Sequence, residues 1–116
     1  DMVGHTGDMQ AAMDACEAVD RCVGDLNAAV ARQKGTLIVT ADHGNCEKMY
    51  EEATGEPHTA HTLNKVPFIL VDPTNAWTLR DDVDTPGLAN VAATVLELCG
   101  ATAPHDYLPS LVTPNG

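Results

Sequence analysis

The sequence predicts an α/β fold, and three observations support that prediction. The chain of 116 residues has two stretches with apolar residues at helical spacing, and two short runs of apolar and β-branched residues lie between them. The resulting order is helix, buried strand, polar loop, strand and helix, which is typical of layered α/β proteins. Ligands in such folds gather beyond the carboxyl ends of the strands, so functional residues are expected there.

The first helix is expected from Asp8 to about Lys34. Its apolar residues recur at steps of three and four, the period of an amphipathic helix: Met9, Ala12, Met13, Cys16, Val19, Val23, Leu26 and Val30. Gly24 is the expected position of a bend, and Gly35 is expected to end the helix.

Two strands are expected in the middle of the chain. Thr36 to Thr40 is too apolar to alternate, which is typical of an interior parallel strand covered on both faces. Val66 to Val71 repeats the pattern, with Pro67 near its first rung and Asp72 and Pro73 stopping it.

A second helix is expected after Thr85 as its cap and Pro86 in its first turn, and it ends at Gly100. The tail from Ala101 to Gly116 is Pro-rich and is expected to be irregular. Two strands do not make a stable sheet, because their edges keep unpaired backbone groups. We therefore expect residues 1–116 to be an incomplete domain cut from a larger one, and we expect self-association through its strand edges.

Composition limits the partners and the location of the chain. With 17 acidic and 6 basic side chains the formal charge is −11, which disfavours nucleic acid and anionic membrane surfaces. No apolar stretch approaches the ~20 residues that cross a bilayer, so a soluble, cytoplasmic protein is expected. The four cysteines lack CxxC spacing and are expected to be reduced, with Cys16, Cys22 and Cys99 in the core and Cys46 as a spectator thiol.

Three short segments concentrate His and Asp residues. They are "DMVGHTGD" at the start of the chain, "TADHGN" from Thr40 and "HTAHT" from His58. Asp42 and His43 directly follow the first strand and therefore stand at its carboxyl end. Imidazole nitrogens combined with carboxylate oxygens suit Zn²⁺ or Mn²⁺, whereas a structural zinc site would recruit thiolates. Together the segments predict a metal site.

Each of these residues also has an ordinary structural explanation. Asp1 and Asp8 are acceptable helix caps, and His5, His58 and His61 are acceptable exposed turn residues. For a single residue that explanation is preferred. For three separate Asp and His clusters, one of them at the end of a buried strand, the metal site is preferred.

The motifs "DMVGHTGD", "TADHGNCEKM" and "GEPHTAHTLNKVPFILVD" closely resemble the carboxyl-terminal part of cofactor-independent phosphoglycerate mutases. "EAVDRCVGDL" and "LANVAATVLELCG" resemble the same family in order and spacing. The family belongs to the alkaline-phosphatase-like superfamily. The resemblance implies that the chain is part of a three-layer α/β/α sandwich, the carboxyl-terminal portion of a metal-dependent phosphotransferase domain.

The resemblance also implies two divalent ions, with manganese as the first choice and magnesium, cobalt or zinc as alternatives. Asp1, His5 and His61 would hold the first ion, and Asp42 and His43 would contribute to the second. His58 is expected to be a neighbour of the ligands and not one of them.

The family reaction interconverts 3-phosphoglycerate and 2-phosphoglycerate in glycolysis through a phosphoserine. The one serine of this chain, Ser110, lies in the tail without a base or a metal ligand beside it, so the nucleophile is expected upstream. The isolated chain is expected to be inactive, because the substrate-binding arginines and a lysine also come from the missing amino-terminal part. Its partners would be that part and the small phosphoglycerate substrate.

Two alternatives remain open. One is another member of the superfamily, such as a phosphatase, a sulfatase-like hydrolase or a phosphopentomutase, although the stretch "HTAHTLNKVP" argues against it. The other is a non-catalytic module for metal binding or assembly.

Overall fold

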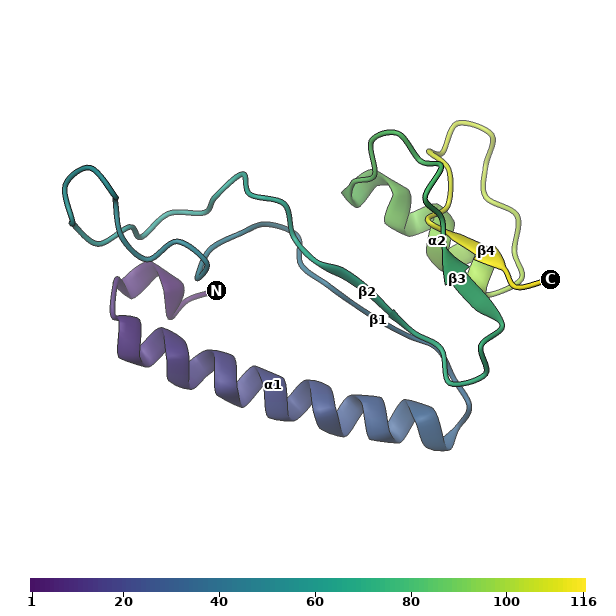
Figure 1. Ribbon diagram of the computed structural model, residues 1–116, viewed down its shortest axis with the longest axis horizontal. Helices are drawn as coiled ribbons and strands as arrows, with labels where there is room; N and C mark the ends of the chain where they lie inside the picture. The colour runs from purple at the N-terminus through teal and green to yellow at the C-terminus, as the bar shows by residue number, and fades with distance from the viewer. The chain divides into compact units, whose positions relative to one another are not determined.

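A computed structural model describes residues 1–116, and the chain divides into two compact units (Figure 1). Unit 1 consists of Asp1–Ala29 and Val39–Ile69, and unit 2 of Val30–Ile38 and Leu70–Gly116. The elements, in chain order, are the 3-10 helix η1 (Gly4–Thr6), α1 (Met9–Arg32), β1 (Leu37–Thr40), β2 (Phe68–Val71), β3 (Trp77–Leu79), the 3-10 helix η2 (Leu88–Asn90), α2 (Val91–Leu98) and β4 (Val112–Pro114). The four predicted elements therefore occur in the predicted order, as α1, β1, β2 and α2.

The first predicted helix is confirmed as α1, which is 24 residues long and runs through Gly24 without interruption. Asp8 caps it, since its carboxylate accepts the Ala11 N–H at 3.0 Å. The helix ends at Arg32, and the left-handed residue beyond it is Lys34, with φ 53°, and not the expected Gly35.

The apolar stripe of α1 is not packed into a core. Ala12 is its one buried residue, while Val19 and Leu26 expose 61% and 57% of their surface. Three residues of the stripe line an open cavity of about 720 Å³ in unit 1 together with Val39 and Ile69: Cys16, Val19 and Val23. The predicted burial of Cys16, Cys22 and Cys99 is wrong for the same kind of reason: all three are exposed, because a helical period shows which face is apolar and not what covers it.

The two predicted strands are confirmed as β1 and β2, which pair with each other. They run in opposite directions (Figure 1), and the Thr40 hydroxyl at the end of β1 donates to the Pro67 carbonyl, before the start of β2, at 2.8 Å. The expectation of a parallel strand buried on both faces is therefore wrong for β1. Its residues are half-buried or exposed, because β2 is its one partner strand.

Unit 2 contains a strand pair that the sequence analysis does not predict. β3 and β4 are antiparallel, with Trp77 opposite Pro114 and Leu79 opposite Val112, so the tail is not wholly irregular. Val112 is 1% exposed and Ala93 of α2 is 2% exposed, which places the small core of the unit here. The buried Thr94 hydroxyl joins α2 to the tail, because it accepts the Leu111 N–H at 2.9 Å.

The second predicted helix begins later than expected. Thr85 does not cap it; the chain enters η2 at Gly87, whose N–H donates to the Asn90 side chain at 2.9 Å. Asn90 also donates to the Pro109 carbonyl at 2.7 Å, so it ties the helix start to the tail. The end at Gly100 is confirmed, since that residue takes the left-handed φ of 73°. None of the helices in the chain combines the length and apolar character needed to cross a membrane.

Candidate metal centre

Asp1, His5 and His61 come together in unit 1, and one ligand atom of each lies within 4.8 Å of the others. Nε2 of His61 is 3.0 Å from Oδ1 of Asp1 and 3.1 Å from Nε2 of His5. Nε2 of His5 is 3.3 Å from the same Asp1 oxygen. All three side chains are partly open to solvent, so an ion could reach them.

His5 lies in η1, and Asp1 precedes it by four residues. Gly7 then takes the left-handed φ of 71°, and a Cβ there would lie 2.6 Å from the Pro57 side chain. Glycine is therefore required for the chain to leave η1 so close to this neighbour. The His5 ring is fixed from the third histidine-bearing segment, because its Nδ1 lies 2.6 Å from the Thr59 carbonyl oxygen.

Asp42 and His43 follow β1, and His43 stacks on His61. The two ring centroids are 3.5 Å apart, with an interplanar angle of 19°. Nε2 of His43 lies 3.5 Å from Asp42 and 3.8 Å from Oδ1 of Asp1. Asp42 is the most exposed member, with 87% of its side chain accessible. Asp1, His5 and His61 thus form the tight group, and Asp42 and His43 form a pair beside it.

The orientation of the rings fits metal binding. Nδ1 of His5 and Nδ1 of His43 each face a backbone carbonyl, of Thr59 at 2.6 Å and of Gly44 at 3.2 Å. A carbonyl only accepts hydrogen bonds, so each Nδ1 carries a proton, and Nε2 is the nitrogen of each ring that faces the cluster. Metal-binding histidines are commonly oriented by such a bond. The donor set contains no thiolate, which favours an intermediate or hard divalent ion.

The surroundings of His61 favour the neutral form of its ring. Its pKa is lowered from the ordinary 6.5, first by partial desolvation and then by the neighbouring imidazoles of His43 and His5. A neutral imidazole is the form that binds a metal ion.

Two residues that the sequence analysis overlooks hold these segments together. Glu47 accepts hydrogen bonds from the Asn45 N–H, the Thr62 hydroxyl and the Asn64 amide, the last at 3.0 Å. The Thr62 bond is the main cause of a Glu47 pKa lowered to about 2. Asn45 is buried against Gly4, where a Cβ would overlap the Asn45 side-chain oxygen. The pattern Gly-Asn-x-Glu, which begins four residues after the end of β1, is the feature of the sequence that could have indicated them.

His58 is not a member of the group formed by Asp1, His5 and His61. Its Nδ1 is 2.5 Å from one carboxylate oxygen of Glu51, and the other oxygen of Glu51 accepts a hydrogen bond from Lys48 at 2.9 Å. The thiol of Cys46 is half-buried, and burial together with the nearby Cys16 thiol raises its pKa. A protonated thiol is a poor nucleophile and a poor ligand.

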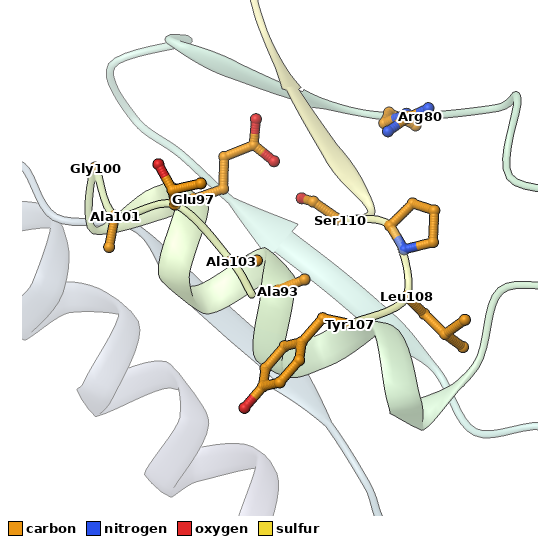
Figure 2. A pocket seen from close by; sticks show the side chains of 11 residues that line it. Arg80, Ala93, Glu97, Gly100, Ala101, Ala103, Tyr107, Leu108 and Ser110 are labelled. Atoms are coloured by element: carbon orange, nitrogen blue, oxygen red, sulfur yellow. The ribbon is translucent and has the colours of Figure 1, made fainter. Parts of the chain in front are cut away.

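A second pocket, of about 520 Å³, lies in unit 2 around Arg80, Glu97, Tyr107 and Ser110 (Figure 2). It does not offer a free cationic clamp, because Arg80 donates twice to Asp82, at 2.8 Å from both Nε and Nη2. The Ser110 hydroxyl is used by the backbone, since it accepts the Val112 N–H at 3.2 Å.

A comparison with known protein families assigns most of the chain to one of them. The model of the metalloenzyme superfamily matches residues 1–103. That range contains all five residues singled out as metal ligands.

Curated relatives carry a consistent name. The 2,3-bisphosphoglycerate-independent phosphoglycerate mutase of Roseobacter denitrificans is 54% identical over 106 residues, which are 91% of this chain and 20% of that protein. The enzyme of the same name from Ruegeria pomeroyi is 52% identical over 114 residues, or 97% of this chain and 22% of the relative. The chain therefore spans about a fifth of the length of these relatives.

A solved structure agrees with the sequence comparison. The phosphoglycerate mutase of Leishmania mexicana, studied at low cobalt concentration, matches with a TM-score of 0.87 and 42% identity. The match covers 99% of this chain and 23% of the Leishmania chain.

Proposed function

Because the chain belongs to the metalloenzyme superfamily, we propose that it forms the metal-binding part of a phosphoglycerate mutase that interconverts 3-phosphoglycerate and 2-phosphoglycerate. The relatives' printed names support the reaction, and the histidine cluster supports the role of this part. The observation that carries the proposal is the convergence of Asp1, His5 and His61, whose ligand atoms lie within 4.8 Å.

Asp1, His5 and His61 would hold one divalent ion, and Asp42 and His43 would contribute to a second. Two bound divalent ions would polarise the oxygens of a phosphoryl group and stabilise a nucleophilic alkoxide. Manganese is the first choice and cobalt a close alternative, since the donors are imidazole nitrogen and carboxylate oxygen. The ring orientations at His5 and His43 would be set in advance by the carbonyls of Thr59 and Gly44.

The chain's own residues would bind and orient the phosphoryl group without attacking it. Ser110 is engaged with the backbone of Val112, and Arg80 is neutralised by Asp82. The nucleophile and the substrate-binding cations would come from the other four-fifths of a protein as long as the relatives. The chain alone would therefore show no mutase activity.

A chimera tests the reaction. The corresponding fifth of the Roseobacter denitrificans enzyme is replaced by this chain, and interconversion of the two phosphoglycerates is assayed with Mn²⁺. We expect an active chimera and no activity from the chain alone. A well-folded but inactive chimera, or turnover by the chain alone, would contradict the proposal. His105→Ala in the chimera is the control, because this exposed histidine lies outside the cluster.

Calorimetry with Mn²⁺ or Co²⁺ tests the metal site in the isolated chain. We expect one ion to bind more tightly than any other, because three donors of the chain converge at the first site and two at the second. Two equally tight ions, or none, would contradict this assignment of ligands.

A further inference from the structure

Glu47 ties together the two segments that carry His43 and His61, although it touches neither ring. One carboxylate oxygen accepts the Asn45 N–H at 2.5 Å, two residues beyond His43. The other oxygen accepts the hydroxyl of Thr62, the residue after His61, and the Asn64 amide at 3.0 Å. A single side chain therefore bridges both segments.

The backbone is joined at the same place. Gly44 and Thr62 form an isolated antiparallel bridge, in which the Thr62 N–H donates to the Gly44 carbonyl at 2.9 Å. A Cβ on Gly44 would overlap both the Thr62 hydroxyl and the Glu47 carboxylate. Residue 44 must therefore be glycine for the carboxylate to cross over the backbone and reach Thr62.

We propose that Glu47 is a positioning residue for the metal centre, which fixes the separation of His43 and His61 and so the separation of the two ions. This inference rests on the proposed function. Each histidine belongs to a different ion site in that proposal, and their rings are 3.5 Å apart between centroids. A charged acceptor gives stronger and more directional bonds than a neutral one, so a carboxylate suits this role.

The donors on Glu47 are a backbone N–H, a hydroxyl and an amide, which are all neutral, and no cation shares the carboxylate. Its negative charge therefore remains near the cluster and favours the binding of cations there. This effect adds to the positioning of the rings by the hydrogen bonds of the carboxylate. Replacement by glutamine would remove that charge and one acceptor oxygen, while the other oxygen could still accept from Thr62 and Asn64. Replacement by alanine would remove the bridge.

The test uses the full 116-residue chain with Glu47→Ala, Glu47→Gln and the matched control Glu52→Ala, an exposed acidic residue of the neighbouring loop with no side-chain bond. Two quantities are measured at a temperature well below the unfolding transition. The first is the dissociation constant of Co²⁺, obtained from the visible absorption of the bound ion. The second is the nuclear Overhauser effect between the His43 and His61 rings in the absence of metal. We expect Glu47→Ala to weaken Co²⁺ binding about tenfold or more and to reduce the ring-to-ring effect. Glu47→Gln should fall between the alanine variant and the wild type, and Glu52→Ala should match the wild type.

Wild-type Co²⁺ affinity together with an unchanged ring-to-ring effect in Glu47→Ala would overturn the inference. An equal loss of Co²⁺ affinity in Glu52→Ala and Glu47→Ala would also overturn the inference, because the removal of one negative charge would then explain both results. If the wild type binds no Co²⁺, the proposed function fails, and the metal-free ring measurement still decides whether Glu47 positions the two histidines.

Discussion

His43 and His61 lie ring against ring, with centroids 3.5 Å apart and planes inclined by 19°. Their segments are joined by the Gly44 and Thr62 bridge, and residues 49–58 form a hairpin between them, closed by a second bridge from Tyr50 to Pro57. Two imidazoles at this distance repel each other when both are protonated. The cluster is therefore built for neutral rings or for a bound cation.

Removal of His61 should abolish the tighter metal site. His61→Ala takes away the nitrogen that lies closest to Asp1 and His5, so we expect Mn²⁺ or Co²⁺ affinity to fall by more than about a hundredfold. Calorimetry on the isolated chain measures the loss. His105→Ala is the matched control and should bind like the wild type; equal losses in the two variants would count against the assigned ligands.

Acid should destabilise the metal-free chain through His61. Its pKa in the folded chain is below the ordinary 6.5, so the unfolded chain binds more protons between these two values. The stability contributed by the neutral ring is fully present above 6.5 and is lost as the pH falls through the lower, folded value. The urea midpoint should therefore decrease from about pH 7.5 to pH 5.5, and His61→Asn should flatten that decrease. A wild-type midpoint independent of pH would contradict the prediction.

Gly4→Ala should weaken metal binding by displacing the segments that carry the cluster. The added methyl group would overlap the Asn45 side chain, so either η1 or the segment after His43 must move. We expect metal affinity to fall about tenfold, which corresponds to ~1.4 kcal/mol. Gly24→Ala is the control, because nothing lies within 4 Å of its Cβ, and it should instead stabilise α1 by about 0.5–1 kcal/mol.

The isolated chain should self-associate. The apolar stripe of α1 includes Val19, 61% exposed, and Leu26, 57% exposed, and β1 and β2 form a sheet of two strands. Sedimentation should show a mass that rises with concentration. Val19→Glu should shift the distribution toward monomer, and Ala18→Glu, which adds the same charge off the stripe, should shift it less. A wild-type monomer at all concentrations would disprove the prediction.

Much of the local structure could be predicted from the sequence, because it depends on local patterns. The period of three and four gave α1, and the apolar runs gave β1 and β2 within two residues. The pairing of β3 with β4 could not be found this way, because it joins Trp77 to Pro114 across most of unit 2. The exposure of Cys16 could not be predicted either, since it depends on what packs over a helix and not on the period of the helix.

The residue types of the candidate site could be predicted from the sequence, but the contacts that hold these residues in place could not. The repeated Asp and His residues predict a metal site, and the resemblance to the mutase family implies Asp1, His5 and His61 as one set of ligands; their ligand atoms lie within 4.8 Å of one another. The stacking of His43 on His61 and the bridging carboxylate of Glu47 depend on a loop closed through space, which no spacing in the chain encodes.

The hairpin of residues 49–58 is closed near its base by the Tyr50 and Pro57 bridge, and its tip turns through Gly55 with φ 71° and open space around it. Lengthening such a tip costs little free energy, since loop entropy changes only slowly with length. A fluorescent peptide or an affinity tag grafted between Thr54 and Gly55 should therefore leave the histidines in place. The tip thus offers an attachment point for a label that reports metal binding, and no other position of the chain needs to be labelled.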